Sequence, residues 1–142
     1  MYVTRVVDAK TTRGRSYLVT DGGMNHQTPA TGNFGQVFRK PYPVAIQNRL
    51  DADPDACDSV VGPCCTPQDV LGTDLQLPSA CVGDTVGIFY SGAYGYSASS
   101  LAFLSHPTPA EILIYRGQTH LLREAGPMDQ VLRGQRSLPT NM

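Results

Sequence analysis

The sequence VVGPCCTPQD at positions 60–69 organises the rest of this chain. Val60 and Val61 are β-branched and predict the end of a buried strand, and the Gly62-Pro63 pair predicts a turn that breaks it. Thr66-Pro67 followed by an acidic residue is typical of a helix start, with a capping hydroxyl and a proline at the first helical position. We therefore expect a strand, a turn and then a helix.

The two cysteines of this stretch lie between the expected strand and the expected helix. A thiol at a helix N-terminus is close to the positive end of the helix dipole, which lowers its pKa. Cys64 and Cys65 are therefore candidates for a reactive thiol. The alternative is that both are small buried apolar side chains, which spacing alone favours because most free cysteines are of that kind.

A second stretch, SGAYGYS at positions 91–97, follows about two strands further along the chain. It is small, polar and aromatic, and it comes directly after an apolar run that predicts a strand. We expect the loops that carry Cys65 and Tyr94 to lie at one rim of the fold. Two interpretations of Tyr94 stay open here, a site residue or a packed aromatic side chain with a satisfied hydroxyl.

Composition excludes several classes of function. The chain has 142 residues, and its length predicts a single domain over residues 1–142, with a looser tail from about residue 124. Charged residues make up only 16% and the net charge is −1, so no electrostatic case exists for nucleic acid or a membrane surface. We see no apolar run long enough to cross a bilayer and no signal peptide.

The cysteine and histidine spacings predict no metal site. The four cysteines form no C-x-x-C pair, and the three histidines show no ligand spacing. Reduced thiols together with the missing signal peptide indicate a cytoplasmic protein.

The pattern of short apolar runs and turns predicts a mainly β protein. Glycine and proline are frequent (14 and 11 residues) and long helical patterns are rare. We expect an antiparallel β-barrel with one or two short helices. The predicted elements are strands at residues 3–9, 16–20, 42–48 (an edge strand), 85–90, 110–115 and 120–123, a long loop at 24–38 and a short helix at 127–132.

An ordered set of short motifs resembles the C-terminal domain of the pyridoxal-phosphate-dependent decarboxylases of the ornithine and diaminopimelate group. The motifs are Asp21-Gly22-Gly23-Met24-Asn25, Gly62-Pro63-x-Cys65-x-x-x-Asp69, Gly83-Asp84, Gly92-Ala93-Tyr94 and Pro109-Ala110-Glu111-Ile112-Leu113. Within this group, the sequences of residues 30–35 and 97–107 most resemble the branch associated with exosortase and exopolysaccharide systems. Relatives of that branch are thought to act on amino acids bound to a carrier protein.

This resemblance implies a cytoplasmic homodimeric enzyme of amino-acid metabolism with two domains in each subunit. An N-terminal alanine-racemase-like (β/α) barrel carries the cofactor lysine and makes most of the contacts to pyridoxal 5'-phosphate. A Greek-key-like β-barrel of the present type, like the C-terminal domain of alanine racemase, follows it. Each C-terminal domain lends residues to the active site of the other subunit.

The resemblance also assigns roles to four residues. Cys65 would be catalytic, reaching across the subunit interface to help protonate the substrate carbanion after carbon dioxide leaves. Tyr94 would bind the cofactor, with its hydroxyl near the phosphate or the substrate. Thr66 and Asp69 would contribute to substrate binding, and Asp69 would also cap the helix start and hold the Cys65 loop.

Two departures from the family pattern weaken the case for a diamino-acid substrate. Thr66 follows the cysteine, where diaminopimelate decarboxylases carry a glutamate and ornithine decarboxylases an aspartate. A neutral hydroxyl cannot supply the charge-assisted bond that a distal ammonium group needs. The Thr28-Pro29-Ala30-Thr31-Gly32 segment also does not match the Arg-Pro-Ala-Leu-Tyr segment of the diaminopimelate enzymes.

The lysine content limits what this polypeptide does alone. A pyridoxal enzyme holds its cofactor as a Schiff base on a lysine, and this chain has only Lys10 and Lys40, neither in a context that resembles the cofactor site. We therefore expect the lysine-bearing barrel to be absent and the isolated chain to be inactive. Two alternatives are an amino-acid racemase domain and a stand-alone β-barrel that acts as a binding or assembly module.

Overall fold

The computed structural model describes residues 1–35 and 37–138, and within them the chain is mainly β. Contacts divide it into two compact units, Met1–Ser100 and Leu101–Met142. Gln36 in the predicted loop and residues 139–142 in the predicted tail lie outside the described residues. The strands are β1 (Tyr2–Thr12), β2 (Arg15–Thr20), β3 (Val44–Ile46), β4 (Ala56–Val61), β5 (Val70–Leu77), β6 (Thr85–Ile88), β7 (Glu111–Tyr115) and β8 (Gln118–Arg123).

Helical structure is limited to single turns. They are the 3-10 turns η1 (Thr28–Thr31), η2 (Gln47–Arg49), η3 (Phe103–Ser105) and η4 (Met128–Leu132), and the α-helical turn α1 (Gly95–Ala98). The predicted helix at residues 127–132 is therefore a 3-10 turn, with Pro127 as the residue before its first position.

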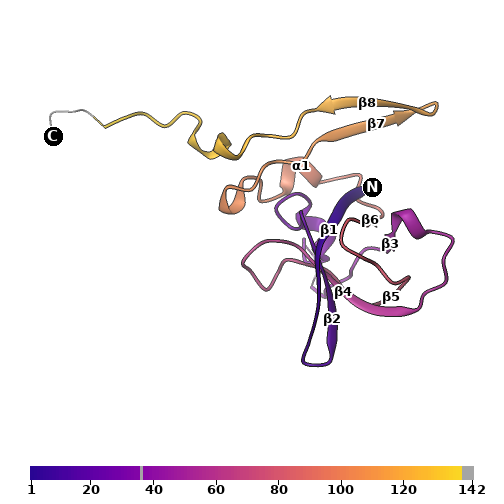
Figure 1. Cartoon of the computed structure of the whole chain (residues 1–142). Coiled ribbons are helices and arrows are strands. Elements are labelled where there is room, and N and C mark those ends of the chain that lie inside the picture. The colour runs from indigo at the N-terminus through magenta and orange to yellow at the C-terminus, as the bar shows by residue number, and fades with distance from the viewer. Residues whose placement is uncertain (36, 139–142) are drawn as a thin grey trace. The chain divides into compact units, whose positions relative to one another are not determined.

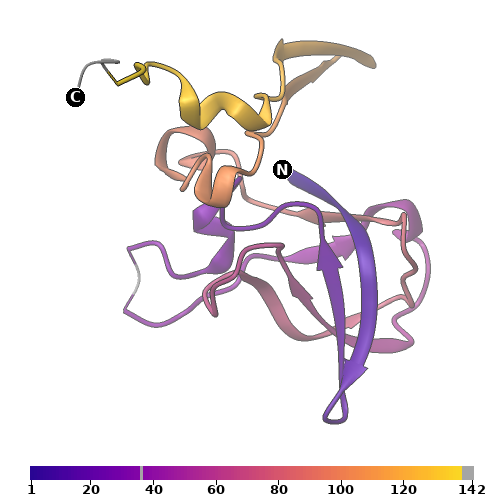
Figure 2. The same cartoon turned by 60° about the vertical axis from the view of Figure 1, so that its left-hand side comes forward.

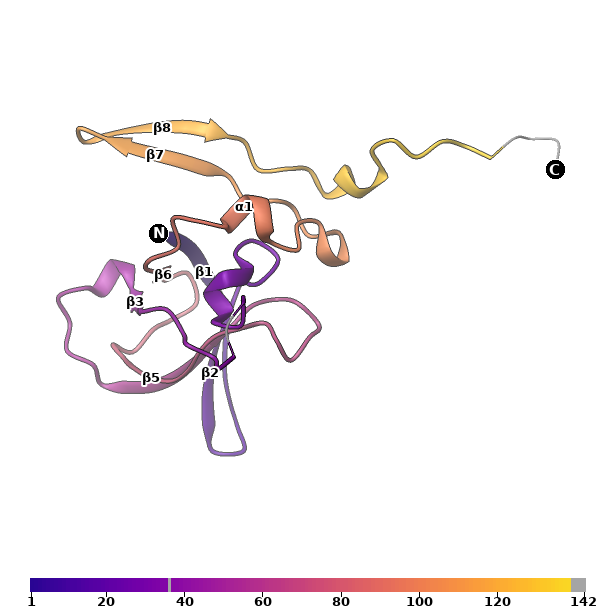
Figure 3. The same cartoon turned by 180° about the vertical axis from the view of Figure 1, so that it is seen from behind.

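Six strands of the first unit form one curled sheet in the order β3-β6-β1-β2-β4-β5. Neighbouring strands run antiparallel except for β2 and β4, which pair in parallel. The terminal strands of this order, β3 and β5, contact each other, so the sheet is nearly closed into a barrel (Figure 3). The predicted mainly antiparallel β-barrel is confirmed.

The first hairpin shows how local sequence determines the sheet. Arg13 and Gly14 both have positive φ, as a tight two-residue hairpin turn requires, so β1 and β2 extend closer to the turn than predicted. Side chains alternate along β1, with Tyr2, Thr4 and Val6 buried and their neighbours exposed. The far end of this hairpin extends beyond the rest of the sheet (Figures 1 and 2).

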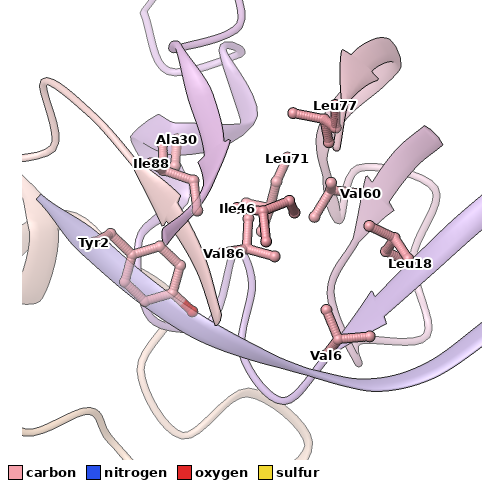
Figure 4. Packing of buried hydrophobic residues seen from close by; sticks show 10 residues of the cluster. All are labelled: Tyr2, Val6, Leu18, Ala30, Ile46, Val60, Leu71, Leu77, Val86 and Ile88. Atoms are coloured by element: carbon pink, nitrogen blue, oxygen red, sulfur yellow. The ribbon is translucent and has the colours of Figure 1, made fainter. Parts of the chain in front are cut away.

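Every strand of the barrel contributes to one hydrophobic core (Figure 4). Its fully buried members include Val6 from β1, Ile46 from β3, Val60 from β4, Leu71 from β5 and Val86 from β6. At the ordinary value of about 25 cal/mol per Å² of apolar surface, burial of each such side chain contributes roughly 1.5–3 kcal/mol. A core shared by all six strands holds the barrel and its loops in place.

The second unit contains a two-stranded hairpin, β7 and β8, joined by a tight turn. Arg116 and Gly117 both have positive φ, which again suits a two-residue hairpin turn. A charged pair links the ends of the two strands, with the Arg123 Nε donating to Glu111 Oε2 at 2.7 Å. The strands predicted at residues 110–115 and 120–123 are confirmed.

Candidate functional site

The loop at residues 62–69 connects β4 to β5 without a helix. Its ends are joined by a hydrogen bond from the Gly62 N–H to the Asp69 carbonyl at 3.0 Å, and Asp69 N–H donates to the Thr66 carbonyl at 3.1 Å. The predicted helix start is therefore wrong. β4 and β5 are antiparallel neighbours, so the connection must reverse direction within eight residues. The pairing of β4 with β5 therefore determines the conformation of this loop, and the local capping pattern does not.

Asp69 holds the loop from inside. Its side chain is only 2% exposed. One carboxylate oxygen accepts from the Cys64 N–H at 2.8 Å and the other from the Met24 N–H at 2.7 Å. The prediction that Asp69 caps a helix is thus wrong. Its carboxylate accepts hydrogen bonds from two loop N–H groups instead. Its predicted role in substrate binding stays a prediction.

Two glycines make room for the Asp69 carboxylate. A Cβ atom added at Gly23 would lie 2.1 Å from Asp69 Oδ1, and one added at Gly62 would lie 2.3 Å from both carboxylate oxygens. Real Cβ atoms do not approach other atoms so closely. The Gly62-Pro63 turn and the Asp21-Gly22-Gly23 motif therefore surround the same buried acid.

The two cysteines have opposite environments. Cys64 is buried, and loss of solvation, assisted by the charge of Asp69 and a hydrogen bond to it, raises the thiol pKa from 9.0 to about 12. The lowered pKa predicted for a helix N-terminus is wrong for Cys64, because no helix follows and burial beside a carboxylate favours the neutral thiol. Cys65 is exposed. Of the two, Cys65 is the accessible one.

Thr66 is half-buried next to Cys65. Its hydroxyl oxygen accepts a hydrogen bond from the Gln68 N–H at 3.4 Å. The side chain thus supports the turn of the loop as well as presenting a neutral group beside Cys65.

Tyr94 lies on the second loop in the left-handed conformation, with φ of 59°. Its side chain is 63% exposed and its ring contacts that of Phe34, with centroids 5.8 Å apart. Within the described part of the chain its hydroxyl has no hydrogen-bond partner. The alternative of a packed ring with a satisfied hydroxyl does not describe this side chain.

The segment at residues 23–28 ties the two loops together. On one side the Met24 N–H binds Asp69, below the Cys65 loop. On the other side Gln27 Nε2 donates to the carbonyls of Ser91 and Ala93, at 3.3 and 3.5 Å. The Cys65 and Tyr94 loops are therefore attached to one connecting segment.

The sequence did not indicate that Gln27 connects the two loops, although this residue lies in the predicted long loop at 24–38. Gln27 is only 3% exposed, and a Cβ atom added at Gly95 would lie 2.4 Å from its Oε1. A glycine directly after Tyr94 is the one sequence signal of this close approach.

Asn25 was also missed, and it is fully buried. Its Oδ1 accepts from the Gly23 N–H at 3.0 Å. Its Nδ2 has no hydrogen-bond partner among residues 1–35 and 37–138. A buried amide whose two N–H donors are unused is costly, so the surroundings of Asp69 contain polar capacity that the described residues leave unused.

A pocket of about 210 Å³ opens beside these loops. It is formed by residues of the long loop at 24–38 and by one residue of the Cys65 loop. Its lining residues are Met24, Thr28, Thr31, Asn33, Phe34, Gly35 and Gln68.

The described residues do not fit a complete pyridoxal phosphate site. Lys10 is paired with Tyr17 in the β1–β2 hairpin, and Lys40 is an exposed loop residue whose N–H donates to the Gly32 carbonyl at 3.2 Å. Neither lines the pocket, whose lining has no cationic side chain to hold a phosphate.

The described residues contain neither a metal-binding cluster nor a helix suited to a membrane. No group of three or more histidine, cysteine, aspartate or glutamate side chains in that part of the chain is arranged to hold a metal ion. None of the helices found there is long and apolar enough to cross a membrane.

Residues 1–92 match the family model described as the C-terminal sheet domain of pyridoxal-dependent decarboxylases. The whole chain is 39% identical to the L-glutamyl-[BtrI acyl-carrier protein] decarboxylase of Niallia circulans and covers 34% of that protein. It is 35% identical to the diaminopimelate decarboxylase of Bacillus subtilis over 76% of this chain and 23% of that protein. The chain thus spans about a third or less of the length of these curated relatives.

Solved structures show the same fold. The diaminopimelate decarboxylase of M. jannaschii, crystallised with L-lysine, superimposes with a TM-score of 0.80 over 96% of this chain and 30% of that chain. The sequence identity in this comparison is 24%.

Proposed function

Because the chain belongs to the family of C-terminal sheet domains of pyridoxal-dependent decarboxylases, we propose that it completes the active site of an amino-acid decarboxylase. The lysine-bearing (β/α) barrel of the same enzyme would bind pyridoxal 5'-phosphate. This cofactor stabilises the electron pair that decarboxylation leaves on the α-carbon. The present domain would supply Cys65 and Tyr94 across the interface of a cytoplasmic homodimer.

One observation carries this proposal. Cys65 and Tyr94 are both exposed, and their loops are attached to the same connecting segment through Asp69 and Gln27. Two exposed side chains on loops attached to one segment, without a cofactor lysine or a phosphate site in the described residues, fit half of an active site. The other half must be brought by a partner surface.

The proposed chemistry of Cys65 is proton delivery. When the bond between the α-carbon and the carboxylate breaks, carbon dioxide leaves and the electron pair remains at the α-carbon. The Cys65 thiol donates its proton to that carbon, and solvent then reprotonates the thiolate. Tyr94, whose hydroxyl is unused within the described part of the chain, orients the phosphate or the substrate.

The apolar hairpin of the second unit supports the need for a partner domain. Ile114 and Leu122 are 72% and 65% exposed, and both faces of β7–β8 carry exposed apolar side chains. A two-stranded hairpin is only marginally stable by itself, and apolar surface of this kind marks an interface. We propose that the lysine-bearing barrel of the complete enzyme covers it.

The proposed substrate is an amino acid with a neutral distal end, free or bound to a carrier. Thr66 stands beside Cys65 and offers a hydroxyl, which cannot form an ion pair with a distal ammonium group. The relative from Niallia circulans acts on a glutamyl group attached to an acyl-carrier protein, in keeping with this proposal. The relation to exosortase and exopolysaccharide systems stays a prediction.

The test is the Cys65→Ala variant of the complete enzyme. Loss of a positioned acid costs roughly 100-fold or more in turnover, so kcat should fall by about that factor or the product should change. Cys81→Ala is the matched control, because Cys81 is also exposed but lies outside both loops. Unchanged kinetics and product in Cys65→Ala would contradict the proposed role.

Cofactor trapping separates this function from a chain with its own site. Incubation of the 142-residue chain with pyridoxal phosphate and borohydride should give no specific adduct on Lys10 or Lys40. A saturable adduct on either lysine would show that the chain binds the cofactor alone. The family match argues against a racemase domain or a stand-alone binding module.

A further inference from the structure

The pocket beside the Cys65 loop has an uncharged lining, although the proposed reaction at Cys65 involves charged groups. None of its described lining residues is charged. Its walls combine the apolar side chains of Met24 and Phe34 with neutral polar side chains. Burial of a charged group in such a pocket is unfavourable, because no opposite charge compensates for its lost hydration.

The hydroxyls of the pocket are already used inside the loop. The Thr28 hydroxyl donates to the Met24 carbonyl at 2.8 Å and accepts from the Ser100 N–H at 3.2 Å. The Thr31 hydroxyl donates to the Thr28 carbonyl at 2.8 Å. These two side chains shape the pocket and have little capacity left for a ligand.

Two side-chain amides remain available. Asn33 and Gln68 are exposed, and within the described residues neither side-chain amide forms a hydrogen bond. A primary amide offers both a donor and an acceptor, which is the pattern that pairs with another amide. The pocket therefore presents amide-complementary groups over an apolar floor.

The position of the pocket relates it to the proposed reaction site. Gln68 belongs to the same loop as Cys65. Phe34 contacts the ring of Tyr94, and the Met24 N–H binds the Asp69 carboxylate that holds the Cys65 loop. A substrate whose reacting end lies near Cys65 and Tyr94 could thus extend its other end into this pocket.

The volume indicates part of a ligand. A water molecule occupies about 30 Å³ in the liquid, so 210 Å³ corresponds to roughly seven waters. Complete small-molecule sites usually measure about 300–1,000 Å³. The pocket thus suits a short part of a ligand rather than a complete small molecule.

We propose that this pocket binds the distal part of the substrate, an acyl chain that ends in a neutral amide or thioester, through Asn33 and Gln68. The inference rests on the proposed function and specifies its substrate class. It means that discrimination against amino acids with a free distal ammonium group is built into this domain.

Binding can be tested without the cofactor and without turnover. The ¹⁵N-labelled 142-residue chain, kept reduced, is titrated with S-acetyl-N-acetylcysteamine, a neutral molecule that has one thioester and one amide. We expect saturable shifts of the side-chain NH₂ signals of Asn33 and Gln68. The diamine 1,5-diaminopentane should leave these signals unchanged.

The variants make this test specific. Loss of a hydrogen bond between neutral groups costs about 1 kcal/mol, so Gln68→Ala and Asn33→Ala should each weaken binding about fivefold. Gln76→Ala is the matched control, because Gln76 is an exposed strand residue outside the pocket and should leave the affinity unchanged. Folding of each variant is checked by its backbone amide spectrum.

Three outcomes would overturn the inference. They are no saturable shift with the neutral probe, unchanged affinity in Gln68→Ala and Asn33→Ala, or tighter binding of the diamine. Each can occur while Cys65→Ala still abolishes decarboxylation in the complete enzyme. Failure of the pocket and failure of the proposed function are therefore distinguishable.

Discussion

The loop cluster around Asp69 and the β7–β8 hairpin are built on opposite principles. Around Asp69, a buried acid satisfies two loop amides and is enclosed by two glycines. In the hairpin, apolar side chains on both faces are exposed and the pairing of two strands supplies most of the order. The first region is completed by its own chain, whereas we propose that the second is completed by a partner surface. Substitutions should therefore affect stability strongly in the first and weakly in the second.

The largest expected effect follows from Asp69→Ala. This change leaves the buried Met24 and Cys64 N–H groups without an acceptor, and each such loss costs about 1–3 kcal/mol. We expect the free energy of unfolding to fall by roughly 3–5 kcal/mol in a urea titration. Asp53→Ala, in an exposed loop, is the control and should change it by less than about 0.5 kcal/mol. Equal stability of the two variants would remove the distinction between the regions.

Gly62→Ala tests the space around the same carboxylate. The added methyl group would lie 2.3 Å from both Asp69 oxygens, so the acid or the loop must move. Overpacking of this kind costs typically about 1–3 kcal/mol. Thermal unfolding measures the loss, and Gly92→Ala provides the comparison, because a Cβ atom there meets nothing within 4 Å. A Gly62→Ala protein as stable as Gly92→Ala would contradict the packing described.

Cys64 links stability of the loop cluster to alkaline pH. Below about pH 9 its thiol is protonated in the folded and unfolded chains, so it adds no pH dependence. Between pH 9 and about pH 12 the unfolded thiol ionises while the folded one keeps its proton, so stability falls as pH rises. Urea titrations at pH 7, 9 and 10.5 should show a smaller decline in Cys64→Ala than in the natural sequence. Parallel declines in the two proteins would refute this environment for Cys64.

Alkylation separates Cys64 from Cys65 directly. The thiolate is the reacting form, and a pKa near 12 reduces its fraction about 1,000-fold relative to a thiol with a pKa near 9. In the folded chain at pH 8, iodoacetamide should modify Cys65 at least about 100-fold faster than Cys64, as followed by peptide mass spectrometry. In urea the two rates should converge. Equal rates in the folded chain would place both cysteines at the surface.

The smallest effect on stability is expected in the hairpin. Ile112→Thr with Ile114→Thr keeps the β-branched shape but removes apolar surface that is already exposed. The free energy of unfolding of the 142-residue chain should change by less than about 0.5 kcal/mol. Sedimentation should show less self-association than in the unmodified chain. A large loss of stability would mean that the hairpin is completed within the chain, and the comparison with the Asp69 cluster would fail.

Most strands were predictable because they depend on local patterns. The alternation in β1, the β-branched end of β4 and the glycine turns after Arg13 and Arg116 are all readable from neighbouring residues. The helix start at Thr66 was predicted wrongly, because its capping pattern is local while the antiparallel pairing of β4 and β5 is not. The parallel pairing of β2 with β4 also has no local signature.

In the candidate site, too, some features were predictable from the sequence and others were not. The motifs marked Cys65, Thr66, Asp69 and Tyr94 as residues of interest, and their assigned roles stay predictions for the experiments above. Residue type and spacing alone could not distinguish Cys64 from Cys65, because adjacent residues have the same spacing signal, whereas the family motif selected Cys65. Burial beside Asp69 distinguishes them by raising the pKa of one thiol and leaving the other exposed.

The sequence by itself determined a β-rich domain, its family and the two loops that carry the candidate residues, because these depend on residue types and their order. Tertiary structure alone decided that Asp69 faces inward, that Gln27 tethers the Tyr94 loop and that an uncharged pocket lies beside them. The reason is physical. Burial and hydrogen bonding depend on which distant segments meet, and Met24 and Asp69 meet because β2 pairs with β4 and β4 pairs with β5.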